Sequence, residues 1–117
     1  MALAVCRAVT VLCVAPDAER LQELKRATVA AEWELAPGAT DLREALDQVD
    51  ALRPHVMVVF GEFDELVSLV TERFPAMTIV ADRQMPGVTE VVEDVADVRA
   101  ALRMQRRPGG PVGMGPQ

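Results

Sequence analysis

The sequence predicts a single doubly wound α/β domain built on a mostly parallel, five-stranded sheet. The chain has 117 residues, a length typical of one domain. Apolar runs without polar alternation recur along it, as in strands that are buried on both faces of a parallel sheet. Segments with helical spacing of apolar residues separate the first four predicted strands, so strand and helix alternate.

The first strand–helix unit is predicted close to the start of the chain. Residues 8–14 form a β-branched apolar run, which indicates a buried strand. Asp17 follows a proline and can cap a helix that extends to about Ala31. Residues 32–36 then alternate in polarity, which predicts a short strand at the edge of the sheet.

The next two helices and the third strand repeat this order. Thr40 or Asp41 can cap a second helix. This helix ends before Pro54, because the residue before a proline disfavours the α conformation. Residues 55–60 form another buried strand, and Asp64 can cap a third helix.

The pattern changes after the fourth strand, which is predicted at residues 77–81. The next apolar run, residues 88–92, begins too soon for a crossover helix, since such a connection usually takes about a dozen residues or more. We therefore expect the fourth helix to be missing or very short. The fifth strand either returns through an extended loop or is not parallel, and Asp94 caps the last helix.

The end of the chain has a different composition. Residues 108–117 are rich in Gly and Pro and cannot form a packed core, so they predict a flexible tail or linker. The domain is expected to occupy residues 1–107.

Composition excludes several functional classes. The chain carries 12 Lys and Arg against 18 Asp and Glu, a net charge of −6, and 3% aromatic residues. Direct nucleic-acid binding is not expected, because phosphate contacts need clustered basic residues and single strands need stacking surfaces. No apolar run has the length of a membrane span, so we expect a cytoplasmic domain without one. With one His, two Cys and no Cys-x-x-Cys spacing, no metal and no cofactor is expected.

Three phrases of the sequence resemble the receiver domains of bacterial response regulators. They are Val-Leu-Cys-Val-Ala-Pro-Asp at residues 11–17, Arg-Pro-His-Val-Met-Val-Val-Phe at residues 53–60, and the closing residues 91–102. The likeness covers roughly residues 8–107 and implies a flavodoxin-like strand order.

The resemblance also implies a site that this sequence lacks. Receivers hold Mg²⁺ with an acidic pair after the first strand, take a phosphoryl group on an Asp that ends the third strand, and respond through a Thr or Ser and a Lys. Hard cations need oxygen ligands, and the transferred group needs positive charge beside it. The matching positions hold Ala15 and Pro16 for the acidic pair, Phe60 for the phosphoacceptor, Ala81 or Asp82 for the Thr or Ser, and Glu93 for the Lys.

The resemblance is therefore to a degenerate pseudo-receiver, also called an atypical receiver domain. Such domains precede ATPase domains in pilus-assembly and septum-site proteins, where they serve in localisation or dimerisation. Asp17 could be a remnant of the acidic cluster, although a helix N-cap explains it with fewer assumptions. We expect a non-enzymatic, phosphorylation-independent module for protein interaction or dimerisation, with an ATPase or output domain in a longer native chain.

The last helix carries the expected interaction surface. Its apolar positions must be buried somewhere, and without a fourth helix we expect the sheet face beside them to be under-covered, which a homodimer would cover. Its basic cluster, Arg103, Arg106 and Arg107, complements the helix C-terminus, docks on an acidic partner, including a second copy, or contacts phosphate or an anionic membrane. The surface comprises Val95, Val98, Leu102, Arg103, Arg106 and Arg107.

Two alternatives stay open. A small α/β enzyme or phosphocarrier could use Cys13 as its nucleophile, although the residues directly after it, 14–17, include no basic residue to lower the thiol pKa. A receiver with a shifted phosphoacceptor could use Asp64 or Asp82.

Overall fold

Five parallel strands form one sheet in the order β2-β1-β3-β4-β5 in the computed structural model, which describes residues 9–106. This order confirms the predicted doubly wound, flavodoxin-like class. The strands are β1 (Val9–Val14), β2 (Trp33–Leu35), β3 (Val56–Val59), β4 (Thr78–Ala81) and β5 (Glu90–Val91). The helices are α1 (Ala18–Thr28), α2 (Leu42–Leu52), α3 (Asp64–Arg73) and α4 (Val98–Arg106), with a short 3₁₀ helix, η1 (Val95–Asp97), before α4.

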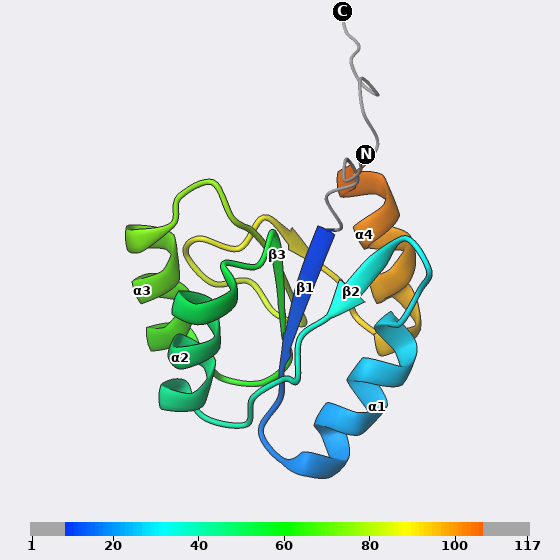
Figure 1. The fold of residues 1–117 in the computed structure, drawn as a ribbon, viewed down its shortest axis with the longest axis horizontal. Helices are drawn as coiled ribbons and strands as arrows, with labels where there is room; N and C mark the ends of the chain where they lie inside the picture. Colours follow the sequence, from blue (N-terminus) through cyan, green and yellow to red (C-terminus); the bar gives the residue numbers. More distant parts are fainter. Residues whose placement is uncertain (1–8, 107–117) are drawn as a thin grey trace, which may run out of the picture.

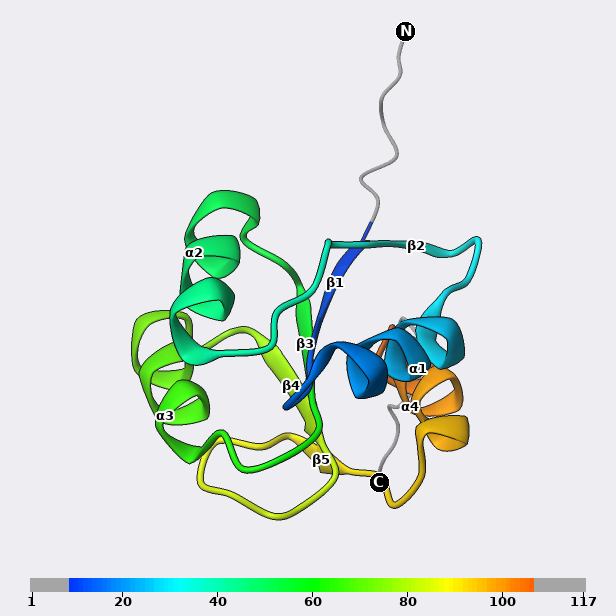
Figure 2. The ribbon, with the colours of Figure 1, turned by 90° about the horizontal axis from the view of Figure 1, so that it is seen from below.

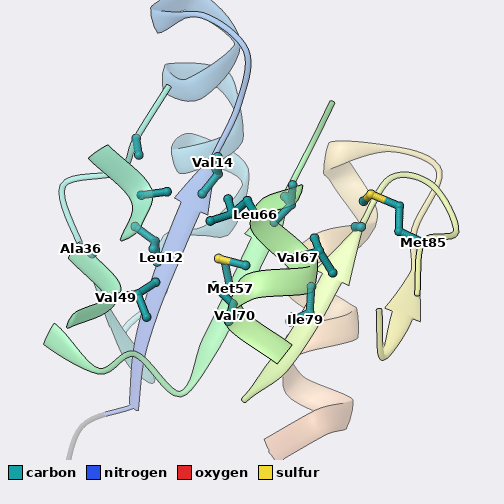
Figure 3. Close-up of a cluster of buried hydrophobic side chains, with 14 residues drawn as sticks. Leu12, Val14, Ala36, Val49, Met57, Leu66, Val67, Val70, Ile79 and Met85 are labelled. Atoms are coloured by element: carbon teal, nitrogen blue, oxygen red, sulfur yellow. The ribbon is translucent and has the colours of Figure 1, made fainter. Parts of the chain in front are cut away.

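Helices cover the sheet on both faces (Figures 1 and 2). Helices α2 and α3 lie on one face, and α1 and α4 lie on the other. The core cluster under α2 and α3 includes Leu12, Met57 and Leu66 (Figure 3). The second cluster includes Val58 and Leu102. Residues that are adjacent on one strand therefore serve different layers, and both layers are apolar.

The first strand explains why its sequence does not alternate in polarity. Val11 and Cys13 belong to the cluster beside α1 and α4, whereas Leu12 and Val14 belong to the cluster beside α2 and α3. All four side chains are fully buried. A central parallel strand covered on both faces has no solvent-facing side, so every position is apolar.

Three of the predicted helix caps are confirmed, and one is wrong. The Asp17 and Asp41 side chains accept backbone hydrogen bonds from residues 20 and 44. The Asp94 side chain accepts one from residue 96 and caps η1, which leads directly into α4. Asp64 was expected to cap the third helix, but Phe63 is its N-cap residue and makes no side-chain capping bond within the described chain. Asp64 is instead the first helical residue, where its negative charge complements the helix dipole.

Helix α1 is shorter than predicted and ends at Thr28. The Thr28 hydroxyl donates to the Leu24 carbonyl, and the indole N–H of Trp33 donates to the Thr28 carbonyl at 2.8 Å. The Trp33 side chain, from β2, therefore supplies a hydrogen bond to a carbonyl at the C-terminal end of α1. Val29 is already non-helical, with ψ at 137°.

The connection from β4 to β5 confirms the missing fourth helix. Residues 82–89 contain no helix, and β5 pairs with β4 in parallel, so the chain returns through an extended loop. Met85, which is 2% exposed, and the partly buried Val88 enter the cluster under α2 and α3 from this loop. These two apolar side chains thus cover part of the sheet face that a fourth helix would otherwise cover.

The expected under-covered face beside the last helix is wrong. Val98 and Leu102 are 0% and 1% exposed, and they pack with Leu24 of α1 in one cluster, while Val95 is half-buried. The loop that stands in place of the missing helix packs on the opposite face of the sheet, through Met85 and Val88, and α4 packs against α1. Val98 and Leu102 are core residues and do not form a docking surface.

Polar contacts also tie α4 to β2. The Arg103 guanidinium donates to Glu32 at 2.8 Å and lies 5.9 Å from the centre of the Trp33 ring. The Arg106 side chain, Arg107 and the expected tail over residues 108–117 lie outside the described residues. Among the helices of the described chain, none is long and apolar enough to cross a membrane.

Candidate functional site

The carboxyl ends of the strands bring the predicted site positions to one edge of the sheet. The Phe60 N–H donates to the Val14 carbonyl at 2.9 Å, and the Asp82 N–H donates to the Val59 carbonyl at 3.2 Å. The residues that follow β1, β3 and β4 are therefore neighbours. Doubly wound folds bind their ligands at this edge.

The positions expected for an acidic pair do not supply a metal site. Ala15 is fully buried, and Pro16 is exposed. The Asp17 carboxylate accepts the backbone N–H of Arg20 at 2.8 Å and caps α1. This agrees with the interpretation of Asp17 as a helix N-cap. Within residues 9–106, no group of three or more His, Cys, Asp or Glu side chains could hold a metal ion.

Phe60 occupies the position after β3, and its side chain is 9% exposed. It packs in the core cluster beside α1 and α4, and it also lines an open pocket of about 300 Å³ at this edge. Asp82 and Glu93 line the same pocket. Asp64 does not: it lies in a separate pocket between the N-terminal ends of α2 and α3.

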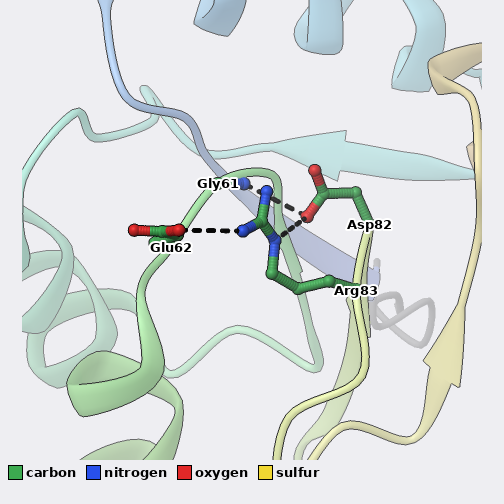
Figure 4. Close-up of polar contacts among 4 residues, drawn as sticks. All are labelled: Gly61, Glu62, Asp82 and Arg83. Carbon is green, nitrogen blue, oxygen red and sulfur yellow. Dashed lines mark hydrogen bonds and ion pairs between the residues drawn. The ribbon is translucent and has the colours of Figure 1, made fainter.

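A polar network joins the loop after β3 to the loop after β4 (Figure 4). The Oδ1 atom of Asp82 accepts the Gly61 N–H at 3.2 Å and the Arg83 Nε–H at 3.3 Å. Arg83 also donates from Nη1 to the Glu62 carboxylate at 3.4 Å. The Asp82 side chain is 19% exposed, while that of Glu62 is 82% exposed. The inner contact, between Arg83 and Asp82, is therefore more sheltered from solvent than the outer contact, between Arg83 and Glu62.

The network stabilises the charged form of its arginine. The hydrogen bond and the charge of Asp82 raise the pKa of Arg83 above its usual value. Glu62 and Asp64 raise this pKa further through their negative charges. The charges of three carboxylates therefore favour the cationic form of Arg83, and two of them, Asp82 and Glu62, also accept hydrogen bonds from it.

Gly61 is required for this geometry. Its φ is 115°, a conformation that side chains disfavour. A Cβ atom at this position would lie 3.2 Å from Pro16 Cδ and 3.3 Å from Phe63 Cε2. Glycine therefore lets the chain turn tightly after β3 and aim its N–H at Asp82.

The structure argues against Cys13 as a nucleophile. Cys13 is fully buried in β1, and burial raises the pKa of its thiol to about 11. A hydrogen bond with Thr28 and the charge of Lys25 lower this pKa only in part. At neutral pH the thiol is protonated and has no access to a substrate.

Sequence reasoning did not find the Gly61–Asp82–Arg83–Glu62 network. Asp82 was predicted only as a match to the receiver Thr or Ser position or as a shifted phosphoacceptor, and Arg83 was not singled out. The available signal was a glycine directly after a buried strand together with an Asp-Arg pair directly after the next one. Such residues meet only if the two strands are neighbours in the sheet, as β3 and β4 are.

Solved structures of receiver domains match this fold, whereas neither a protein-family model nor a curated protein matches the sequence. The signal receiver domain of an HD domain-containing protein from Pseudomonas fluorescens Pf-5 matches at a TM-score of 0.69 and 16% identity, covering 84% of this chain and 94% of that one. A CheY-like response regulator receiver domain protein from Methanospirillum hungatei JF-1 matches at 0.70 and 14% identity, covering 85% and 94%.

An orphan response regulator of H. pylori matches in the same way, at a TM-score of 0.67 and 11% identity, with 85% of this chain and 97% of that one covered. At these identities the likeness concerns the fold. The expectation of a receiver fold from the three sequence phrases is confirmed.

Proposed function

We propose that this chain, which has the fold of response-regulator receiver domains, is a phosphorylation-independent module without catalytic activity that acts by binding proteins, including a second copy of itself. The observation that carries the proposal is Phe60 at the position after β3, where the resemblance puts the phosphoacceptor. A phenyl ring has no oxygen that could attack a phosphoryl group.

The polar network supports the same proposal. Asp82 is the carboxylate closest in sequence to the end of β4, and its Oδ1 atom already accepts hydrogen bonds from Gly61 and Arg83. These donors hold the loops after β3 and β4 together without a phosphoryl group or a metal ion. A module held in one arrangement in this way needs no chemical switch to present a surface.

The interaction surface in this proposal is the groove between β5 and the outer side of α4. Val91 and Met104 are 39% and 67% exposed, and both line this open groove of about 340 Å³. Exposed apolar side chains that are grouped together are typical of protein-binding surfaces. These two residues replace Val98 and Leu102, which are buried.

The outer side of α4 suits contact with a second copy. Ala100 is small and exposed, and Asp97 and Arg103 stand three positions before and after it. If two α4 helices pack antiparallel across a two-fold axis at Ala100, Asp97 of each copy faces Arg103 of the other. Opposite charges then meet on both sides of the axis, which favours this orientation.

The setting of the module is part of the proposal. We infer a cytoplasmic location, in signalling or in localisation, and an ATPase or output domain in a longer native chain. The matched receivers named above include an isolated receiver domain of an HD domain-containing protein, which supports a modular arrangement by analogy.

The first experiment tests the loss of phosphorylation. The chain is incubated with acetyl phosphate and Mg²⁺ and weighed by mass spectrometry, and its Trp33 fluorescence is followed with beryllofluoride and Mg²⁺. We expect no added phosphoryl mass and no Mg²⁺-dependent spectral change. A mass increase that Asp82→Asn or Asp64→Asn abolishes would establish a shifted phosphoacceptor and contradict the proposal.

The second experiment tests self-association. Sedimentation velocity at high micromolar concentration is expected to detect a dimer that Met104→Glu dissociates. Leu52→Glu is the matched control, because Leu52 is also an exposed apolar residue, 45% exposed, on the outer side of α2. A chain that remains monomeric at all concentrations would refute self-association and leave heterologous binding to be tested with the same variants.

A further inference from the structure

A second open site lies at the amino ends of the strands. It is on the edge of the sheet opposite to the one that carries Phe60 and Asp82, which we call the receiver-like edge. Residues at the starts of β1, β3 and β4 and at the end of α3 line a groove of about 580 Å³. This volume lies within the range of small-molecule sites in proteins. Val9, Phe74 and Met77 give the groove its apolar part, and all three side chains are half-buried.

The charge of this groove differs from that of the rest of the molecule. The chain has a net charge of −6, yet the residues that line this groove include Arg53 and His55 and neither Asp nor Glu. The pocket between α2 and α3, the pocket at the opposite edge of the sheet and the groove beside β5 each contain at least three acidic residues. An anion therefore meets the least repulsion at the amino ends of the strands.

Arg53 is held at the mouth of the groove by an unusual backbone conformation. It follows α2 with φ at 48° and ψ at 61°, and it is the non-glycine residue with positive φ among the residues that the structure describes. Glycine or asparagine is the usual residue at this helix-ending position, because a side chain disfavours the left-handed region. Such strained residues concentrate at functional sites.

The contacts of Arg53 leave its positive charge available to a ligand. Its guanidinium carbon lies 5.2 Å from the centre of the Phe74 ring, and its Nε–H donates to the backbone carbonyl of Asp50. Arg73, on the same ring at 5.9 Å, instead pairs with the Asp50 carboxylate at 3.2 Å. The acid in this region is thus bound to Arg73, and the ring fixes the position of Arg53.

His55 adds a hydrogen-bond donor beside this cation. Its Nδ1 atom accepts the Thr10 N–H at 3.2 Å, so the ring proton of the neutral imidazole is on Nε2. The groove therefore combines a guanidinium, an imidazole N–H and an apolar surface made by an aromatic ring and a thioether.

We propose that this groove binds a small organic anion that has an aliphatic or aromatic body. The carboxylate or sulfonate of the ligand binds Arg53 and His55, and the body packs against Phe74 and Met77. Charge-assisted hydrogen bonds fix the acid, while burial of the body contributes most of the affinity. The site is independent of the receiver-like edge and of the β5–α4 groove.

The test uses anilinonaphthalene sulfonate as a fluorescent probe and laurate as a competitor. We expect saturable probe fluorescence with the native chain and displacement by laurate. Arg53→Glu is expected to weaken both affinities by about tenfold or more, as for the loss of a charge-assisted contact. Arg43→Glu, which makes the same charge change at an exposed position in the first turn of α2, is expected to leave both affinities unchanged.

A second variant separates binding from folding. Arg53→Gly removes the guanidinium while suiting the left-handed backbone, so the folded state is retained and the binding is lost. Equal displacement by laurate and by the cation dodecyltrimethylammonium would overturn the proposal, because binding would then depend on apolar contact alone. Binding that appears only after deletion of residues 2–7 would also overturn it, in favour of the chain's own N-terminal segment as the occupant.

Discussion

The Oδ1 atom of Asp82 lies 3.2 Å from the backbone nitrogen of Gly61, and the hydrogen bond between them joins the loop after β4 to the turn after β3. In a receiver-like fold these two loops border the phosphorylation site. Here the Asp82 carboxylate connects the two loops, so a side chain of the protein itself stabilises this edge of the sheet.

Asp82→Ala is expected to destabilise the fold by about 1–2 kcal/mol. The substitution leaves the half-buried Gly61 N–H without its acceptor, whereas the exposed Arg83 keeps its contact with Glu62. Urea denaturation followed by Trp33 fluorescence measures the change. Glu62→Ala, which removes an 82% exposed carboxylate from the same network, serves as the control and is expected to have little effect. Equal losses in the two variants would mean that the inner contact has no special role.

Gly61→Ala is expected to destabilise the chain by about 1–3 kcal/mol. The alanine would have to adopt a φ of 115° and would place its Cβ 3.2 Å from Pro16 Cδ. Thermal unfolding followed by circular dichroism checks this. Glu65→Ala, at an exposed position in the first turn of α3, is the control for this region. An unchanged melting temperature for Gly61→Ala would contradict the requirement for glycine.

Stability is expected to fall at alkaline pH because of Cys13. Its folded-state pKa is raised from 9.0 to about 11, so between these values the unfolded chain loses the thiol proton and the folded chain keeps it. The unfolded state then binds fewer protons, and stability decreases as pH rises, by about 2–3 kcal/mol over this interval.

The measurement compares urea denaturation at pH 8 and pH 10.5 for two proteins. The first carries Cys6→Ser, which removes the other cysteine of the chain, and the second carries Cys13→Ala in addition. The added substitution is expected to remove this part of the pH dependence, while the contributions of other groups cancel. Identical pH dependence in the two proteins would show that Cys13 does not titrate as inferred.

Two substitutions on α4 are expected to differ strongly. Leu102→Ala deletes a side chain that is 1% exposed and is expected to destabilise the fold by about 2–5 kcal/mol. Met104→Ala changes a side chain that is 67% exposed and is expected to leave the stability of the monomer within about 0.5 kcal/mol. Chemical denaturation of both variants at low protein concentration checks this, and similar losses would contradict the assignment of Leu102 to the core and Met104 to the surface.

Local sequence signals predicted most of the fold. Periodicity distinguished strands from helices, the short interval between the fourth and fifth strands indicated that a helix was missing, and Asp17, Asp41 and Asp94 were identified as caps. These features depend on residues that are close in sequence, for which spacing alone determines which side chains share a face. The cap of α3 was missed because Phe63 occupies that position without a side-chain hydrogen bond in the described structure.

The sequence by itself predicted an acidic α/β domain, and its resemblance to receivers assigned Ala15, Pro16 and Phe60 to the positions where a receiver would carry its acidic residues. Only the tertiary structure decided which apolar residues of α4 are exposed and that the Asp82 side chain accepts the Gly61 N–H. It also decided that the Asp50 carboxylate pairs with Arg73, whereas Arg53 contacts only the Asp50 backbone carbonyl. These contacts connect residues such as 61 and 82 that are far apart along the chain. The order of the strands and the packing of the helices bring these residues together, and the local spacing of residues in the sequence reveals neither the strand order nor the helix packing.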